Sequence, residues 1–209
     1  MGNASLPRLN IKFQILNHGF EVHEQACPAT LLTQLQNEFP LDAPFDWELL
    51  DHSPIVREIA TNGIFQELAK SILGEACFPT HAILYNKNDT PKPWQQDTTI
   101  KVHGQGVIEA PDKAIYNRLL AVRLSLDDCT FVDGALKLCP SSHKHGVLTP
   151  QEIRGHSIRP FSSPEMKAGD MLLMHPLTIH ANSASTTGKP RRVIHIVYAA
   201  AEYLTLLRP

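Results

Sequence analysis

In the first third of the chain, hydrophobic residues recur at the spacing of an α-helix. Apolar side chains lie four residues apart between Leu31 and Phe39, which predicts an amphipathic helix that ends before Pro40. Ser53 followed by Pro54 is a typical helix start, because serine caps the N-terminus and proline is tolerated in the first turn. The pattern therefore predicts helices over 29–39, from 54 to a break at 61–63, and from 64 to a stop at 74.

Beyond about residue 80 the pattern changes to short runs rich in valine, isoleucine and leucine, separated by proline, glycine, aspartate and serine. No long helix is predicted between these runs, which argues against a parallel sheet built from strand–helix–strand units. The pattern favours an antiparallel sandwich or jelly roll, with the helices packed outside one sheet. The predicted strands are 81–86, 98–103, 119–126, 135–139, 170–174 and 193–199.

Length and composition restrict the class of protein. A chain of 209 residues suggests one domain that buries roughly 70% of its unfolded surface. A hydrophobic content of 43% with 19% charged residues excludes a disordered tail. A net charge of -2 argues against nucleic-acid binding through a uniform basic surface, and no apolar run approaches the roughly 20 residues of a membrane span. We expect a single domain over 1–209, helical to about 78 and β-structured from about 80 to 200.

The cysteines and the N-terminus bear on location. The four cysteines are scattered without a Cys-x-x-Cys pair, which is typical of reduced thiols rather than a disulfide framework. The N-terminal residues lack the charged and apolar regions of a secretory signal. We therefore expect a cytoplasmic protein.

Histidine, with 11 copies, is the most informative residue type for chemistry, because it binds metals and transfers protons. Polar residues gather at predicted strand ends in three segments, 94–97, 140–146 and 169–192. The Gly-x-Ser-x-Gly elbow of many serine hydrolases is absent, as are a P-loop and a complete Gly-x-Gly-x-x-Gly fingerprint.

The order of these segments resembles the phytanoyl-CoA dioxygenase family over about residues 54–200. The resemblance lies in Trp-x-Gln-Asp at 94–97, Leu-x-Leu-Asp-Asp-Cys at 124–129, Asp-Gly-Ala-Leu followed by Pro-x-Ser-His at 133–143, Gly-Asp leading to a histidine at 169–180, and Arg-Arg-Val-x-His-Ile at 191–196. It implies a mainly β fold, a cupin-like jelly roll or double-stranded β-helix with N-terminal helices outside. It also implies an enzyme that uses Fe(II), 2-oxoglutarate and O₂ to hydroxylate a small molecule.

The resemblance assigns the metal ligands. Asp97 matches the family carboxylate and His180 the distal histidine of a 2-His-1-carboxylate site, which leaves metal positions open for cosubstrate and oxygen. Residues 95 and 97 would point to the same side of an extended segment, roughly 6–7 Å apart, so both can reach one ion. The retained carboxylate favours hydroxylation over halogenation, because related halogenases lose it to make room for chloride.

The resemblance also assigns a cosubstrate site. Arg191, eleven residues after His180, matches the arginine that pairs with the far carboxylate of 2-oxoglutarate. A guanidinium suits this task because it donates two parallel hydrogen bonds. Arg192 would face the other side of the strand, so one of the two is structural, and the spacing favours Arg191. Gln96 and Asn182 are expected to bond the cosubstrate.

Gln95 departs from the family pattern, which has histidine there. A glutamine oxygen is a poorer ligand than imidazole for Fe(II). Along a regular strand His103 lies about 20 Å from Asp97, too far to substitute. The remaining candidates for a replacement ligand, which only tertiary folding can bring near, are His143, His145 and His175.

Two hypotheses therefore stand. The first is an active oxygenase that binds iron through Asp97 and His180, with Gln95 or water as the third ligand. The second is a non-catalytic relative that keeps the fold and acts as a binding or interaction module.

Composition also predicts lid segments at 103–112 and 148–163.

Overall fold

The computed structural model describes residues 14–74, 76–87, 91–102, 106–109, 113–156, 160–189 and 191–202. His103 and most of the predicted lid 103–112 lie outside these residues. In the described part no helix is long and apolar enough to cross a membrane. All four cysteines are described; they are buried and form no disulfide.

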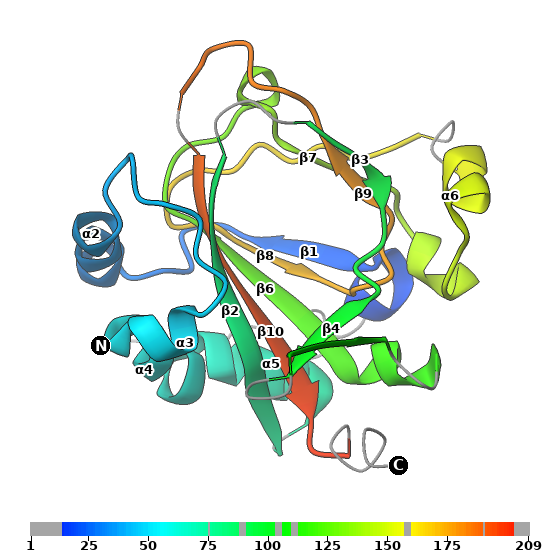
Figure 1. Cartoon of the computed structure of the whole chain (residues 1–209), viewed down its shortest axis with the longest axis horizontal. Coiled ribbons are helices and arrows are strands. Elements are labelled where there is room, and N and C mark those ends of the chain that lie inside the picture. Colours follow the sequence, from blue (N-terminus) through cyan, green and yellow to red (C-terminus); the bar gives the residue numbers. More distant parts are fainter. Residues whose placement is uncertain are drawn as a thin grey trace.

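Two antiparallel sheets and a hairpin make up the β-structure (Figure 1). The smaller sheet has the order β3-β9-β7, and β4 pairs with β5 in the hairpin. The larger, five-stranded sheet has the order β1-β8-β6-β10-β2. This architecture confirms the predicted jelly roll. The strands are β1 (Phe20–His23), β2 (Cys77–Lys87), β3 (Lys92–Gln95), β4 (Thr99–Val102), β5 (Gly106–Glu109), β6 (Leu119–Ser125), β7 (Leu136–Leu138), β8 (Met171–Met174), β9 (His180–Asn182) and β10 (Arg191–Ala200).

The helices form where the apolar periodicity predicts them. The hydroxyl of Ser53 accepts a hydrogen bond from the Val56 N–H at 3.0 Å, which confirms the predicted cap, and Gly63 separates two helices. Figure 1 shows α2, α3 and α4 on one side of the large sheet and α6 on the opposite side, beyond β3 and β9. The helices are α2 (Ala29–Glu38), α3 (Leu49–His52), α4 (Pro54–Asn62), α5 (Ile64–Leu73) and α6 (Pro150–His156), with short 3₁₀ turns η1 (Lys113–Arg118), η2 (Phe131–Asp133) and η3 (Ser142–His145).

The alternation of side chains along β10 separates the core from the interior of the roll. Ile194, Ile196 and Tyr198 are fully buried in the main hydrophobic cluster beneath the helices. The Tyr198 hydroxyl donates a hydrogen bond to the Ala60 carbonyl at 2.9 Å, which ties the strand to α4. Because side chains alternate with period two, the intervening residues face between the two sheets.

Several strands differ from the predicted pattern. The six predicted strands correspond to β2, β4, β6, β7, β8 and β10, whereas β1, β3, β5 and β9 were not predicted. β3 and β9 are short and polar, and they are stabilised by pairing with each other across 85 residues of sequence, with Gln95 opposite His180. The predicted lid 148–163 contains α6, whose Ile153 is buried against Cys139 and Ile179.

Candidate functional site

Three residues from the predicted metal site converge at the edge of the small sheet. The Nε2 atom of His180 lies 3.4 Å from Oδ1 of Asp97 and 3.4 Å from Nε2 of Gln95. Gln95 ends β3 and pairs directly with His180 of β9, while Asp97 follows β3, its N–H bonded to the Pro176 carbonyl. The His180 side chain is 6% exposed and that of Asp97 34%, so the cluster opens on one side.

The orientation of the His180 ring favours a cation next to its Nε2 atom. Its Nδ1 lies 2.9 Å from the Thr178 carbonyl oxygen, and because a carbonyl accepts, Nδ1 carries the proton. In the neutral ring Nε2 therefore directs a lone pair toward the Asp97 carboxylate. Two electron-rich atoms face one another, an arrangement that a proton or a metal ion between them relieves. A backbone carbonyl that holds the far ring nitrogen is the usual support of a metal-binding histidine.

The surroundings also keep Asp97 ionised. Burial on its own raises the pKa of Asp97, but the charge and hydrogen bond that His180 supplies when a proton occupies its Nε2 atom outweigh it, assisted by His195 and Arg123. The net effect holds the pKa of this carboxyl below its ordinary range. Asp97 is therefore an anion at neutral pH, as a metal ligand must be.

The donor set fits a divalent metal with one weak ligand. Two donors about 2.1 Å from one ion and at right angles lie about 3.0 Å apart, close to the 3.4 Å separations found here. The amide nitrogen and oxygen of Gln95 exchange places when the group turns over, which brings its oxygen toward the same point. Within the described ranges no three histidine, cysteine, aspartate or glutamate side chains are grouped so that they could hold a metal ion, and the amide of Gln95 is the further polar group next to Nε2 of His180.

The three histidines considered as replacement ligands lie elsewhere and line neither cavity described below. The ring of His143 lies 5.0 Å from that of His175, and His145 pairs with His156 at 4.4 Å. His175 accepts a hydrogen bond from the Leu177 N–H on Nδ1 and contacts Asn117 through Nε2. The structure therefore gives no support to a substitute among them.

A cavity between the two sheets, here called the inner cavity, adjoins the candidate metal ligands. Arg191, Arg123 and Lys92 bring positive charge to its walls, while Asp97 is its sole carboxylate among the described lining residues. A dianion such as 2-oxoglutarate matches this balance. The lining residues are Tyr85, Lys92, Gln95, Asp97, Arg123, Ser125, Cys129, Leu136, Met166, Leu172, His180, Asn182, Arg191 and Val193.

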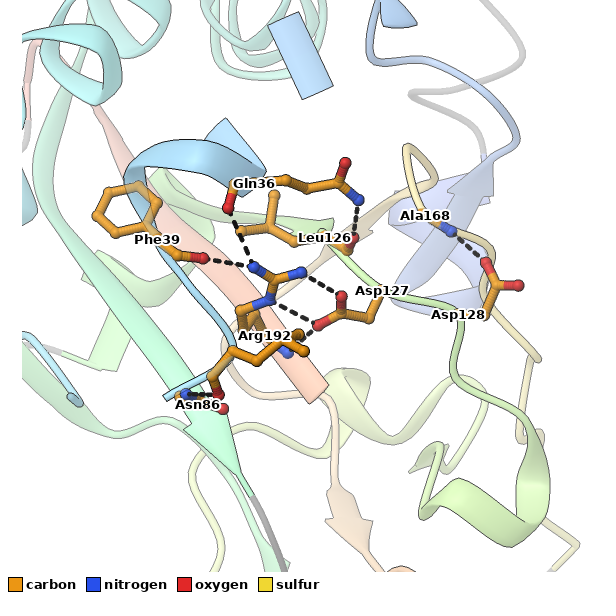
Figure 2. A network of polar contacts seen from close by, with 9 residues as sticks. Gln36, Phe39, Asn86, Leu126, Asp127, Asp128, Ala168 and Arg192 are labelled. Carbon is orange, nitrogen blue, oxygen red and sulfur yellow. Dashed lines mark hydrogen bonds and ion pairs between the residues drawn. The ribbon is translucent and has the colours of Figure 1, made fainter. Parts of the chain in front are cut away.

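Arg191 and Arg192 point to opposite sides of β10, as the spacing predicts. Arg191 lines the inner cavity, where its Nη1 lies 3.6 Å from the Cys129 sulfur. Figure 2 shows the Arg192 guanidinium between Asp127 and the carbonyls of Gln36 and Phe39. Its Nη2 and Nε donate to the two Asp127 oxygens at 2.5 and 2.9 Å. Arg192 therefore fastens α2 to the sheet, and Arg191 is the arginine available to a ligand.

Gly134 leaves the space that the Arg191 side chain occupies. Its φ of 81° lies in the left-handed region, which favours glycine. A Cβ added there would lie 2.5 Å from the Ser183 carbonyl oxygen and 3.3 Å from Nη1 of Arg191. The Asp-Gly pair at 133–134 is thus a structural support for the cavity.

Gln96 and Asn182, both predicted to bond the cosubstrate, lie in different places. Asn182 is 7% exposed and lines the inner cavity. Gln96 does not line it: its amide donates to the carbonyls of Gly146 and Leu177, and accepts from the Leu148 N–H. The Gln96 amide thus makes its three hydrogen bonds to the protein's own backbone, and these bonds connect the end of β3 to the loops that contain Gly146 and Leu177.

The cavity residues to which the sequence assigned no role include Tyr85, Lys92, Arg123 and His195. Arg123 Nη1 lies 3.0 Å from His195 Nδ1, and its guanidinium lies 5.5 Å from the Tyr85 ring centroid. A period-two count from Arg191 along β10 reaches His195 on the same face, so this signal was present in the sequence.

Comparison with known proteins identifies the family of this chain. The model of the phytanoyl-CoA dioxygenase (PhyH) family matches residues 25–193. A phytanoyl-CoA dioxygenase of Arabidopsis thaliana is 32% identical over 88 residues, a match that covers 35% of this chain and 31% of that relative. The chain therefore aligns with about a third of the length of that protein.

Solved structures share the fold at low sequence identity. HygX from Streptomyces hygroscopicus, with nickel and 2-oxoglutarate bound, superposes with a TM-score of 0.76 and 16% identity, covering 94% of this chain and 88% of that one. EctD from S. alaskensis with bound Fe gives 0.73 and 17%, covering 96% and 79%. The α-ketoglutarate-dependent epimerase SnoN from nogalamycin biosynthesis gives 0.73 and 17%, covering 93% and 83%. With a family match that spans most of its length, the chain belongs to the phytanoyl-CoA dioxygenase family.

Proposed function

We propose that this protein is an Fe(II)- and 2-oxoglutarate-dependent oxygenase that hydroxylates a small organic substrate. The observation that carries the proposal is the convergence of Asp97, His180 and Gln95 beside a cavity that Arg191 lines. HygX and EctD, which share the fold, hold nickel with 2-oxoglutarate and iron respectively. Family membership supports the same reaction class.

In this proposal Asp97 and His180 hold the metal, with Gln95 as a weak third ligand. When bound, Fe(II) supplies the oxidation, in which O₂ converts 2-oxoglutarate to succinate and carbon dioxide and oxygenates a substrate carbon. The Thr178 carbonyl keeps the His180 ring turned toward the metal position.

The inner cavity orients the cosubstrate. Arg191 pairs with its far carboxylate, while Asn182 offers an amide beside the metal position. Arg123 adds a second positive charge to the same wall. The apolar walls that Leu136 and Leu172 provide exclude water from the reacting groups, which strengthens every charge interaction inside.

The second candidate is a non-catalytic relative that binds ligands without turnover. The substitution at Gln95 favours it, because an amide oxygen binds Fe(II) less tightly than imidazole. The retained Asp97, His180 and Arg191 favour the oxygenase, since a module without metal chemistry has no need of all three.

One experiment separates the two. Fe(II) and 2-oxoglutarate are added anaerobically, binding is followed by calorimetry, and succinate is measured after O₂ is admitted. The oxygenase predicts Fe(II)-dependent binding of 2-oxoglutarate and release of succinate. Binding without succinate at any iron concentration supports the non-catalytic module, and absence of metal-dependent binding rejects the oxygenase.

A further inference from the structure

A second cavity, here called the outer cavity, adjoins the inner cavity at the candidate metal ligands. Tyr85, Lys92, Gln95 and Asp97 line both. Its volume is about 280 Å³, at the small end of the roughly 300–1,000 Å³ typical of small-molecule pockets. A molecule in the outer cavity would lie next to both the metal position and the cosubstrate site, which is where a substrate must lie.

The outer cavity carries a positive charge that no carboxylate of the described residues pairs with directly. The Lys92 ammonium lies 5.1 Å from the centroid of the Tyr85 ring and forms no ion pair with a described residue. Among the described lining residues the one carboxylate is Asp97, which the proposed function assigns to the metal. Once a divalent ion balances Asp97 and the 2-oxoglutarate dianion pairs with Arg191 and Arg123, the Lys92 charge favours a further anionic partner.

His195 adds an oriented hydrogen-bond donor. Its ring is 4% exposed, and its Nδ1 lies 3.0 Å from a guanidinium nitrogen of Arg123. Because a guanidinium donates and never accepts, Nδ1 holds the lone pair and Nε2 carries the proton. No described residue accepts a hydrogen bond from this Nε2–H, and the ring lines the outer cavity. An N–H that lies at the cavity wall and has no acceptor among the described residues favours a ligand that brings one.

Part of the remaining wall is apolar and aromatic, and it adjoins the polar side chains of His81, Gln96, Thr98 and Thr99. Trp47, which is 51% exposed, lines the cavity and packs edge-on against Phe45, with ring centroids 4.8 Å apart. Phe45 in turn lies 5.5 Å from Tyr85, so an aromatic row runs from the surface to the cavity. Ile83 and Val197 contribute aliphatic surface. This wall suits a hydrophobic substrate body.

We propose, resting on the proposed function, that the outer cavity binds a small substrate with a carboxylate group and an apolar or aromatic body. The carboxylate lies at Lys92 and His195, and the body packs toward Trp47. Arg123 is a positioning residue that fixes the tautomer of His195.

The test uses two probes of equal shape, 3-phenylpropionate and its uncharged amide, 3-phenylpropanamide. Calorimetry measures the binding of each to the full chain with Fe(II) and saturating 2-oxoglutarate under anaerobic conditions. We expect the carboxylate to bind about tenfold more tightly, the scale of a charge-assisted hydrogen bond. Lys92→Met should reduce the ratio to within about twofold. Lys137→Met is the matched control, because Lys137 also lies over aromatic rings but lines neither cavity, and it should keep the wild-type ratio.

The possible outcomes separate this inference from the proposed function. Equal binding of the two probes, no binding of either, or a preference that survives Lys92→Met overturns the inference even when 2-oxoglutarate binds normally. The titration is repeated with Fe(II) but without cosubstrate on Arg191→Met, which lacks one of the two cations that line the inner cavity alone. A carboxylate preference that persists there supports the outer cavity as the site even if metal-dependent 2-oxoglutarate binding fails, and its loss assigns the probe to the inner cavity.

The His195 tautomer gives a second, independent readout. Nitrogen-15 NMR of the histidine rings should show the proton on Nε2 of His195, and 3-phenylpropionate should shift this resonance. Arg123→Gln should redistribute the tautomers, whereas Arg123→Lys should restore the Nε2–H form. A proton found on Nδ1 in the wild-type protein would contradict the arrangement.

Discussion

At the residue scale, the strength of the proposed metal site depends on Gln95. Gln95 lies opposite His180 in the β3–β9 pair and faces the same atom of that ring as Asp97 does. The backbone position thus suits a metal ligand, and the proposed weakness of the site lies in the amide donor of Gln95.

Replacing Gln95 with histidine should tighten Fe(II) binding by about tenfold or more, because imidazole is the stronger donor. The change is read from the dissociation constant of Fe(II) in anaerobic titrations. Gln95→Ala serves as the control, which removes the weak donor and should not tighten binding. No gain with histidine would mean that position 95 contributes nothing to a metal site.

The sequence anticipated several of these positions for physical reasons. Period-two alternation separated Arg191 from Arg192, and the structure places them on opposite faces of β10. The contact between Arg123 and His195 could not be read in the same way, because it joins two strands whose pairing depends on the whole fold. Gln96 was expected to bond the cosubstrate because it is a polar neighbour of the ligands, but its amide is hydrogen-bonded to backbone groups of the protein.

At the scale of elements, the contact between α2 and the large sheet rests on a buried ion pair. The side chains of Arg192 and Asp127 are 5% and 16% exposed, and Arg192 also bonds the carbonyls of Gln36 and Phe39 near the end of the helix (Figure 2). These contacts satisfy carbonyl groups that the helix end leaves without partners.

Arg192→Met should lower the free energy of unfolding by about 3–5 kcal/mol, because it leaves the Asp127 carboxylate buried without its partner. Urea unfolding at neutral pH measures the loss. Lys70→Met removes half of a more exposed pair with Glu67 and should cost less than about 1 kcal/mol. If the two variants were equally stable, Arg192 would not stabilise the contact between α2 and the sheet as the geometry indicates.

Element type was predictable where the periodicity is local. The helices α2, α4 and α5 follow from apolar spacing and from the Ser53 cap, and the long strands follow from their β-branched runs. The short strands β3 and β9 carry proline, lysine, glutamine, histidine and asparagine, and form because the roll brings them together. Long-range pairing of this kind has no local signal in the sequence.

At the scale of the whole molecule, buried histidines make stability depend on pH. Burial, with the nearby His143, lowers the pKa of His175 from 6.5 to about 3, and burial also lowers the pKa values of His143, His23 and His195. At a pH between the lowered pKa of such a histidine in the native state and its ordinary value of 6.5, the unfolded chain binds a proton that the native state does not. Stability therefore falls as the pH decreases through this range.

We expect His175 alone to lower the free energy of unfolding by about 3 kcal/mol between neutral pH and about pH 4. Urea unfolding over that range measures the slope. His175→Asn, whose side-chain oxygen can accept the Leu177 N–H in place of Nδ1, should flatten the slope, whereas the exposed His145→Asn should leave it unchanged. An unaltered slope in His175→Asn would show that His175 titrates alike in both states.

The central claim is that the chain holds a metal and 2-oxoglutarate together, between Asp97, His180 and Arg191. Anaerobic calorimetry of 2-oxoglutarate with the wild-type protein, with and without Fe(II), tests it most directly. We expect binding that depends on Fe(II) and that Arg191→Ala weakens by about tenfold or more, the scale of a charged pair of hydrogen bonds. Binding that ignores Fe(II), or that survives Arg191→Ala unchanged, would contradict the claim.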